Sequence, residues 1–143
     1  METTIPQFDP IKYKNTTRDQ WQSAAEAWYR WSPTLNKWLG KATDKMIEMA
    51  GISKGHRVLD IAAGAGEQSI TVAKTVGTSG YVLATDISSN ILEYAKEMAQ
   101  QNGLENIETK VMDGENINRA LYRAIHFCRI THKFRGQFCR DRF

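Results

Sequence analysis

The chain has 143 residues, of which 41% are hydrophobic and 24% charged, a balance typical of one globular domain rather than of a disordered chain. No apolar run approaches the roughly 20 residues that a membrane-spanning helix needs. The N-terminal residues lack the apolar core of a signal peptide, and two cysteines are too few for a disulfide framework. We therefore expect a cytoplasmic protein without a membrane span.

Charge is distributed unevenly along the chain. Residues 1–118 carry 12 basic and 15 acidic side chains, whereas residues 119–143 carry seven basic side chains and one acidic. The last segment also holds both cysteines and four of the five phenylalanines. This asymmetry indicates either a basic segment that binds anions such as RNA, or a reading frame that changes near residue 118.

The N-terminal third is predicted to be helical after a short arm. Residues 1–17 hold two of the three prolines and show no apolar period, so we interpret them as the arm. Residues 18–52 are predicted to form a cap of two amphipathic helices, separated at Ser32-Pro33, where serine would cap the second helix and proline would open it. Gly51 is predicted to end the second helix. We expect most tryptophans here to pack rather than to contact a substrate. The apolar residues assigned to the two helix faces are Trp21, Ala24, Ala25 and Trp28, and then Leu35, Trp38, Leu39, Ala42, Met46 and Met49.

Residues 53–118 alternate short apolar runs with helical periods. Strands are predicted over 57–63, 81–86 and 107–112, and a helix over 68–76. Ser88-Ser89-Asn90 supplies N-cap chemistry for a second helix, which Gly103-Leu104 stops and whose apolar residues are Ile91, Leu92, Ala95, Met98 and Ala99. Strands that alternate with helices through short connections predict one half of a doubly wound parallel sheet, an α/β fold.

A glycine-rich loop follows the first predicted strand. Gly64-x-Gly66 half-matches the dinucleotide-binding fingerprint, and the lysine of a phosphate-binding loop is absent. Asp60 precedes the loop, Glu67 follows it, and no Lys or Arg lies between Arg57 and Lys74. A pyrophosphate would meet carboxylates here, whereas a cationic ligand with hydroxyl groups would be bound favourably.

Two further aspartates stand at the ends of predicted strands. Asp86 lies twenty residues beyond Gly66, where a carboxylate accepts hydrogen bonds from ribose hydroxyls in nucleoside-binding folds; capping the next helix is the alternative role. Asp113 ends the third strand, where such folds bind ligands, although Asp-Gly is also a common turn pair.

These motifs resemble a known family. The segment from Val58 to Gly66 resembles motif I of class I S-adenosylmethionine-dependent methyltransferases, and the segment from Ala84 to Ser88 resembles their second motif. Met112-Asp113-Gly114 is similar to their third-strand acidic position. The resemblance is strongest to the ubiquinone/menaquinone-biosynthesis (UbiE-like) branch and covers roughly residues 12–118.

The resemblance implies a Rossmann-like half-domain with strand order 3-2-1 and S-adenosyl-L-methionine as cofactor. Asp60 and the backbone of Gly64–Gly66 would hold the methionine end, Asp86 the ribose and Asp113 the adenine amine. Ala62 replaces a glycine found in many members, a mild change that should leave binding possible. The full implied cofactor-binding set is Asp60, Ala62, Gly64, Gly66, Asp86, Ile87, Asp113 and Gly114.

The family's fourth strand, with its Phe-Asp-x-Val type of signature, has no counterpart after Gly114. We therefore expect the C-terminal half of the fold to be missing and residues 119–143 to be a basic tail, non-native or disordered, with a truncated or frameshifted gene as the favoured explanation. The first strand would then be an open edge, and we expect poor stability and weak cofactor binding.

The leading functional hypothesis is a partial S-adenosylmethionine-dependent methyltransferase with a small-molecule acceptor, inactive alone. A non-catalytic nucleotide-binding half-domain with an RNA- or anion-binding tail is the alternative, and Asp60 and Glu67 disfavour a nicotinamide dehydrogenase. No catalytic residue is evident, no nucleic-acid partner is expected, and the oligomeric state is not predicted. No metal site is predicted, because the spacing of the candidate ligands fits no common zinc pattern; those residues are His126, Cys128, His132 and Cys139.

Overall fold

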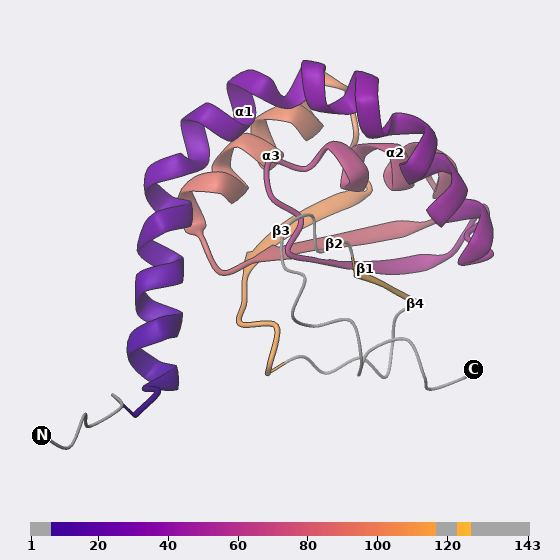
Figure 1. Ribbon diagram of the computed structural model, residues 1–143. Helices are drawn as coiled ribbons and strands as arrows, with labels where there is room; N and C mark the ends of the chain where they lie inside the picture. Colours follow the sequence, from indigo (N-terminus) through magenta and orange to yellow (C-terminus); the bar gives the residue numbers. More distant parts are fainter. Residues whose placement is uncertain (1–6, 117–122, 127–143) are drawn as a thin grey trace, which may run out of the picture.

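The computed structural model describes residues 7–116 and 123–126. Strands β1 (Arg57–Ile61), β2 (Tyr81–Asp86), β3 (Ile107–Val111) and β4 (Arg123–His126) form a parallel sheet in the order β3-β2-β1-β4 (Figure 1). Helix α2 (Glu67–Val76) connects β1 to β2, and α3 (Ser89–Gln101) connects β2 to β3. Both helices lie on the same side of the sheet, as right-handed crossovers in one direction require. The predicted α/β half-fold and its 3-2-1 strand order are confirmed.

The N-terminal region is one helix rather than two. Helix α1 runs from Pro10 to Met49, starts inside the predicted arm, and contains Pro33 in its interior. Asp9 caps it, its Oδ1 accepting from the amides of Ile11 and Lys12 at 3.0 Å each. At its other end, Gly51 has φ 62°, as the sequence led us to expect.

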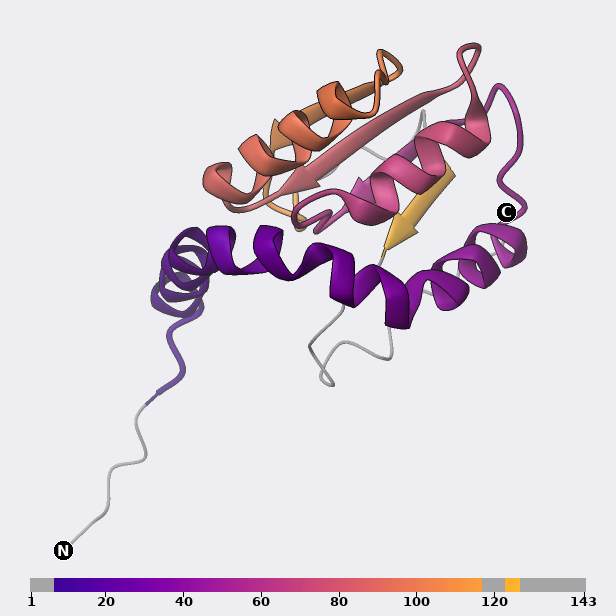
Figure 2. The same cartoon turned by 90° about the horizontal axis from the view of Figure 1, so that it is seen from above.

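The predicted break at Ser32-Pro33 is wrong because Ser32 does not act as a helix cap. Ser32 is buried, and its hydroxyl donates to the carbonyl of Trp28 at 3.0 Å, a bond made within a continuing helix. Pro33 cannot donate to the carbonyl one turn before it, and α1 is visibly bent rather than straight (Figure 2). A bend lets one helix follow the rest of the molecule without a turn.

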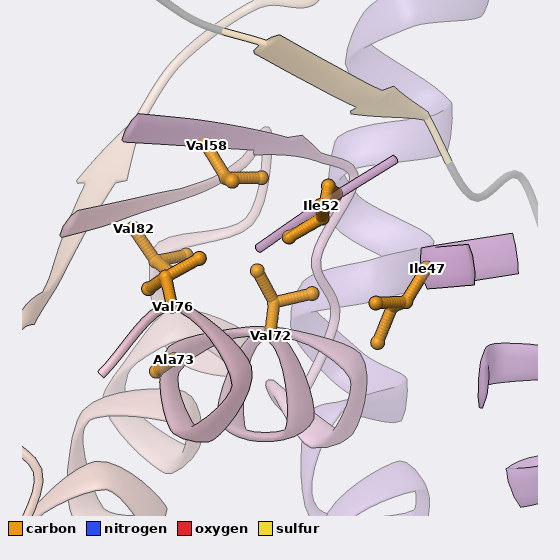
Figure 3. Packing of buried hydrophobic residues seen from close by; sticks show 7 residues of the cluster. All are labelled: Ile47, Ile52, Val58, Val72, Ala73, Val76 and Val82. Atoms are coloured by element: carbon orange, nitrogen blue, oxygen red, sulfur yellow. The ribbon is translucent and has the colours of Figure 1, made fainter. Parts of the chain in front are cut away.

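The core lies between the sheet and its helices. Val58 and Val82 point from β1 and β2 toward Val72 and Val76 of α2, and Ile47 near the end of α1 closes the cluster (Figure 3). The neighbouring positions Leu59, Ile61 and Leu83 form a second buried cluster, and the alternation of side chains along a strand places it on the other face of the sheet.

Some apolar residues of α1 are exposed although they were predicted to pack. Trp38 is 74% exposed and Met49 79% exposed, so these two residues do not belong to the packed face. Trp21 and Trp28 are half-buried, and their rings pack at 5.6 Å between centroids. The packing role expected for the tryptophans therefore holds for this pair and not for Trp31 or Trp38, which are both exposed.

β1 is not an open edge, contrary to the prediction. β4 pairs with it in parallel, with Val58 opposite Arg123 and Ile61 opposite His126. The four residues of β4 lack the apolar run of a buried strand, so no strand was predicted there. A short extended backbone is nevertheless enough to pair with the amides and carbonyls of β1. The expected fate of the remainder of residues 119–143 lies outside the described residues.

No helix in the described part of the chain has the apolar length required to cross a lipid bilayer, although α1 has 40 residues.

Candidate functional site

Asp60 lies one residue before the end of β1 and is only 1% exposed. Its Oδ2 accepts a hydrogen bond from the Ser69 hydroxyl of α2 at 2.6 Å, whereas its Oδ1 has no hydrogen-bond partner among the described residues. Burial raises the pKa of Asp60 to about 7; the Ser69 bond opposes this shift, and the negative charges of Asp86 and Glu67 add to it. The site thus contains a buried acceptor suited to a cationic donor.

Asp86 is the last residue of β2 and lies beside the glycine loop. Its Oδ2 accepts from the Gly64 amide and its Oδ1 from the Ser88 amide, both at 3.0 Å. Burial raises the pKa of Asp86, and these backbone hydrogen bonds act in the opposite direction. Each carboxylate oxygen can accept more than one hydrogen bond, so Asp86 keeps acceptor capacity for a ligand. Ile87 is half-buried and lies between Asp86 and Ser88 in the chain.

The loop between β1 and α2 has three residues with left-handed backbone. Ala62 has φ 59°, Gly64 has φ 60° and Gly66 has φ 93°. A Cβ on Gly66 would lie 2.8 Å from the Cβ of Ala95 in α3, so glycine is needed there for helix packing. A Cβ on Gly64 would meet nothing closer than 4.0 Å. Gly66 therefore serves the fold, while the backbone at Gly64 stays approachable.

Asp113 and Gly114 follow β3, and the Met112 amide donates to the Asp86 carbonyl at 2.9 Å, which brings this segment beside β2. Asp113 Oδ2 accepts from Lys14 Nζ of α1 at 2.6 Å, and Lys14 also pairs with Glu115. The Lys14 hydrogen bond lowers the pKa of Asp113. Asp113 therefore lies in the expected place, but it is already paired with a cation.

Helix α1 contributes contacts that sequence analysis missed. Ala25 packs against Ala65 of the loop and Ile91 of α3, Lys14 reaches Asp113, and Gln22 bonds to the turn after β2. The partners of Lys14 and Gln22 are 66 to 101 residues away in the sequence, so no local spacing could reveal them. The role of Ser69 was also missed, although it stands at the position of the third glycine of the dinucleotide-binding fingerprint.

The electrostatic character of the site is acidic. Asp60, Glu67 and Asp86 are all buried around the start of α2 and the strand ends. Arg57 lies at the opposite end of β1, where its guanidinium stacks 4.6 Å from the centre of the Tyr81 ring. This distribution favours a positively charged ligand over a pyrophosphate, as the sequence indicated.

A groove of about 700 Å³ runs between α1 and α3, beside this site. Gln22, Asn90 and Tyr94 are among its lining residues, and none of the expected cofactor residues is. The groove therefore does not coincide with the residues expected to hold the cofactor. Within the described residues, His, Cys, Asp and Glu side chains form no group of three placed to hold a metal ion. The side chains of His126, Cys128, His132 and Cys139 lie outside the described set.

A family model described as "Methyltransferase domain" matches residues 52–128, more than half of the chain. The chain belongs to the methyltransferase domain family. This match confirms the resemblance found in the motifs, and it covers the strands, the glycine loop and both connecting helices. Family membership supports S-adenosylmethionine as the cofactor.

Curated relatives point to the same branch. The chain is 33% identical over 88 residues to a 2-phytyl-1,4-naphtoquinone methyltransferase of a Nostoc species, covering 55% of this chain and 38% of that protein. It is 40% identical over 58 residues to the ubiquinone/menaquinone biosynthesis C-methyltransferase of Cellvibrio japonicus, covering 41% and 23%. The chain thus spans well under half the length of these relatives.

Solved methyltransferase structures share the fold. Coclaurine N-methyltransferase, solved with N-methylheliamine and SAH, aligns with a TM-score of 0.51 and 30% identity over 56% of this chain and 23% of that one. An RNA methyltransferase from Salinibacter ruber, solved with S-adenosyl-L-homocysteine, aligns with a TM-score of 0.53 over 57% and 53% of the two chains. Its identity of 20% is evidence of the fold alone.

Proposed function

We propose that this chain is the cofactor-binding part of an S-adenosylmethionine-dependent methyltransferase whose acceptor is a small molecule. The observation that carries the proposal is Asp60, a buried carboxylate with one oxygen lacking a partner in the described structure, in an otherwise acidic site. S-adenosylmethionine carries a positive sulfonium and a positive ammonium, so its methionine end fits these residues.

Different residues of the site would contact different parts of the cofactor. Asp60 and the half-buried backbone at Gly64 would hold the methionine end, and Asp86 would accept from the ribose hydroxyls. Asp113 would accept from the adenine amine with the oxygen capacity that Lys14 leaves, and Ala62, Gly66, Ile87 and Gly114 would shape the walls. When bound, the cofactor would supply a methyl group on a positive sulfur: a nucleophile would bond to the methyl carbon while the carbon–sulfur bond breaks and neutral S-adenosylhomocysteine leaves.

The part played by these residues is binding and orientation. No side chain in the site is placed as a general base, and holding two reactants in line accounts for much of the rate gain in such reactions. The names of the relatives described above refer to 2-phytyl-1,4-naphtoquinone, to ubiquinone/menaquinone biosynthesis and to coclaurine, which supports a small-molecule acceptor. The cytoplasmic location and the absence of a nucleic-acid partner stay predictions.

Replacing Asp60 by Asn tests the proposal. Since Asn is neutral, we expect Asp60→Asn to weaken binding of S-adenosylhomocysteine by roughly tenfold or more, as for loss of a charge-assisted hydrogen bond. Binding of 5′-methylthioadenosine, which has no ammonium group, should change much less. Isothermal titration calorimetry measures both affinities.

Asp44→Asn is the matched control, because Asp44 is exposed on α1 and is not part of the glycine loop. It should leave both affinities unchanged. Failure of the wild-type chain to bind S-adenosylhomocysteine, or equal losses for the two ligands in Asp60→Asn, would contradict the proposed role of the site.

A further inference from the structure

The Gln22 side chain joins α1 to the turn between β2 and α3. Its Oε1 accepts from the Ser88 hydroxyl at 2.6 Å and from the Asn90 amide at 2.9 Å, while its Nε2 donates to the Ser89 hydroxyl at 3.0 Å. In return, Asn90 Nδ2 donates to the Gln22 carbonyl at 3.3 Å. One residue of α1 therefore contacts three consecutive residues of this turn.

These bonds complete the cap of α3. Ser88 is the N-cap residue, and its hydroxyl accepts from the Ile91 amide at 3.3 Å. Gln22 supplies the acceptor for the Asn90 amide, one of the helix amides that the helix itself cannot satisfy. Ser88 is fully buried, so without Gln22 its hydroxyl proton would lose its acceptor in a place that water does not reach.

The same turn fixes the orientation of Asp86. The Ser88 amide donates to Asp86 Oδ1, and the Gly64 amide holds Oδ2. The carboxylate is thus clamped between the glycine loop and the capped turn. The Ile87 amide of the same turn is a further backbone donor to Asp86, so a shift of this turn would move the donors that orient the carboxylate.

We propose that Gln22 is a positioning residue for the cofactor's ribose. It holds Ser88, and through Ser88 the Asp86 carboxylate, in the orientation that accepts the ribose hydroxyls. This inference rests on the proposed function, since it assumes that Asp86 binds the ribose. It gives α1 a role at the site besides covering the loop.

The test compares two substitutions of Gln22. Gln22→Met keeps the length and helix preference of the side chain but removes its acceptor and donor. Gln22→Glu keeps the acceptor oxygens, which Ser88 and Asn90 need, and lets Ser89 donate instead. Gln20→Ala is the control, because Gln20 is exposed on the same helix and its side chain makes no hydrogen bond within the described residues.

We expect Gln22→Met to weaken S-adenosylhomocysteine binding by roughly five- to tenfold, the effect of about one hydrogen bond. An S-adenosylhomocysteine analogue lacking both ribose hydroxyls should bind the wild type and Gln22→Met alike. Hydrogen exchange of the Asn90 and Ile91 amides in the ligand-free chain should become faster in Gln22→Met. Gln22→Glu and Gln20→Ala should resemble the wild type in all three measurements.

Equal weakening of both ligands by Gln22→Met would overturn the inference, because it would show a general structural effect. Unchanged S-adenosylhomocysteine affinity in Gln22→Met would also overturn it, and would leave the proposed function standing if the wild type binds. Absence of wild-type binding would instead overturn the proposed function itself, and this inference with it.

Discussion

Among the described residues, Ala62 is the one non-glycine residue with a left-handed backbone. Its φ of 59° lies in the left-handed region, which an alanine Cβ disfavours and glycine adopts freely. The methyl group itself is exposed, so it crowds no neighbour. The cost of alanine here is conformational rather than steric.

We predict that Ala62→Gly stabilises the chain by about 1 kcal/mol, because relief of the left-handed strain exceeds the added entropy of the unfolded chain. Ala27→Gly, the same chemical change at an exposed position inside α1, should destabilise it by about 1 kcal/mol. Urea unfolding gives both values. A loss of stability in Ala62→Gly similar to that in Ala27→Gly would show that the left-handed backbone carries no cost.

Asp60 makes stability depend on pH. Its pKa of about 7 in the folded chain lies above its ordinary value of 3.8, so the folded state holds an extra proton between these pH values. The free energy of unfolding contributed by this group is therefore highest below about pH 4 and falls as pH rises toward 7, by up to roughly 4 kcal/mol. A bound ammonium would lower the pKa again and release the proton.

We predict that the stability of Asp60→Asn relative to the wild type increases as the pH rises from 5 to 8, because the neutral amide does not titrate. Urea unfolding at the two pH values measures this difference, and other carboxylates cancel in the comparison. An identical pH dependence of the two proteins would show that Asp60 does not titrate in this range.

At the scale of elements, α1 carries most of the difference between expectation and structure. Ser-Pro is a common helix start, and only the tertiary position of Ser32, buried and bonded to Trp28, shows that the helix continues. The bent helix places Lys14 on Asp113, Gln22 on the turn after β2 and Ile47 in the core. These three contacts tie one element to three parts of the domain.

The strands and the glycine loop, in contrast, could be predicted from the sequence, because their signals are local. Asp60, Gly64 and Asp86 are related by short spacings along one strand-loop-helix-strand unit. The partners of Asp113 and Ser88 on α1 could not be predicted, since they depend on how α1 packs. β4 was missed for a related reason, because its residues carry no apolar strand pattern and only its pairing with β1 identifies it.

For the whole molecule, the structure places three strand ends, one glycine loop and the N-terminal half of α1 around one acidic region. This is the arrangement that the ends of parallel strands provide in doubly wound sheets, where ligands bind beyond the carboxyl ends. The fourth strand extends the sheet beyond β1 on the side away from β2. The described part of the chain therefore contains each element on which the proposed cofactor site depends.

The most direct test is to map where the ligand binds on the intact chain. Backbone amide chemical shifts, followed by NMR as S-adenosylhomocysteine is added, should change at residues 61–66, 86–88 and 112–114, and NAD should cause little change there. The amide chemical shifts of residues that line the groove between α1 and α3, such as Glu26 and Glu97, should not change. Shifts concentrated in that groove, or equal responses to NAD, would contradict an S-adenosylmethionine site built on Asp60 and Asp86.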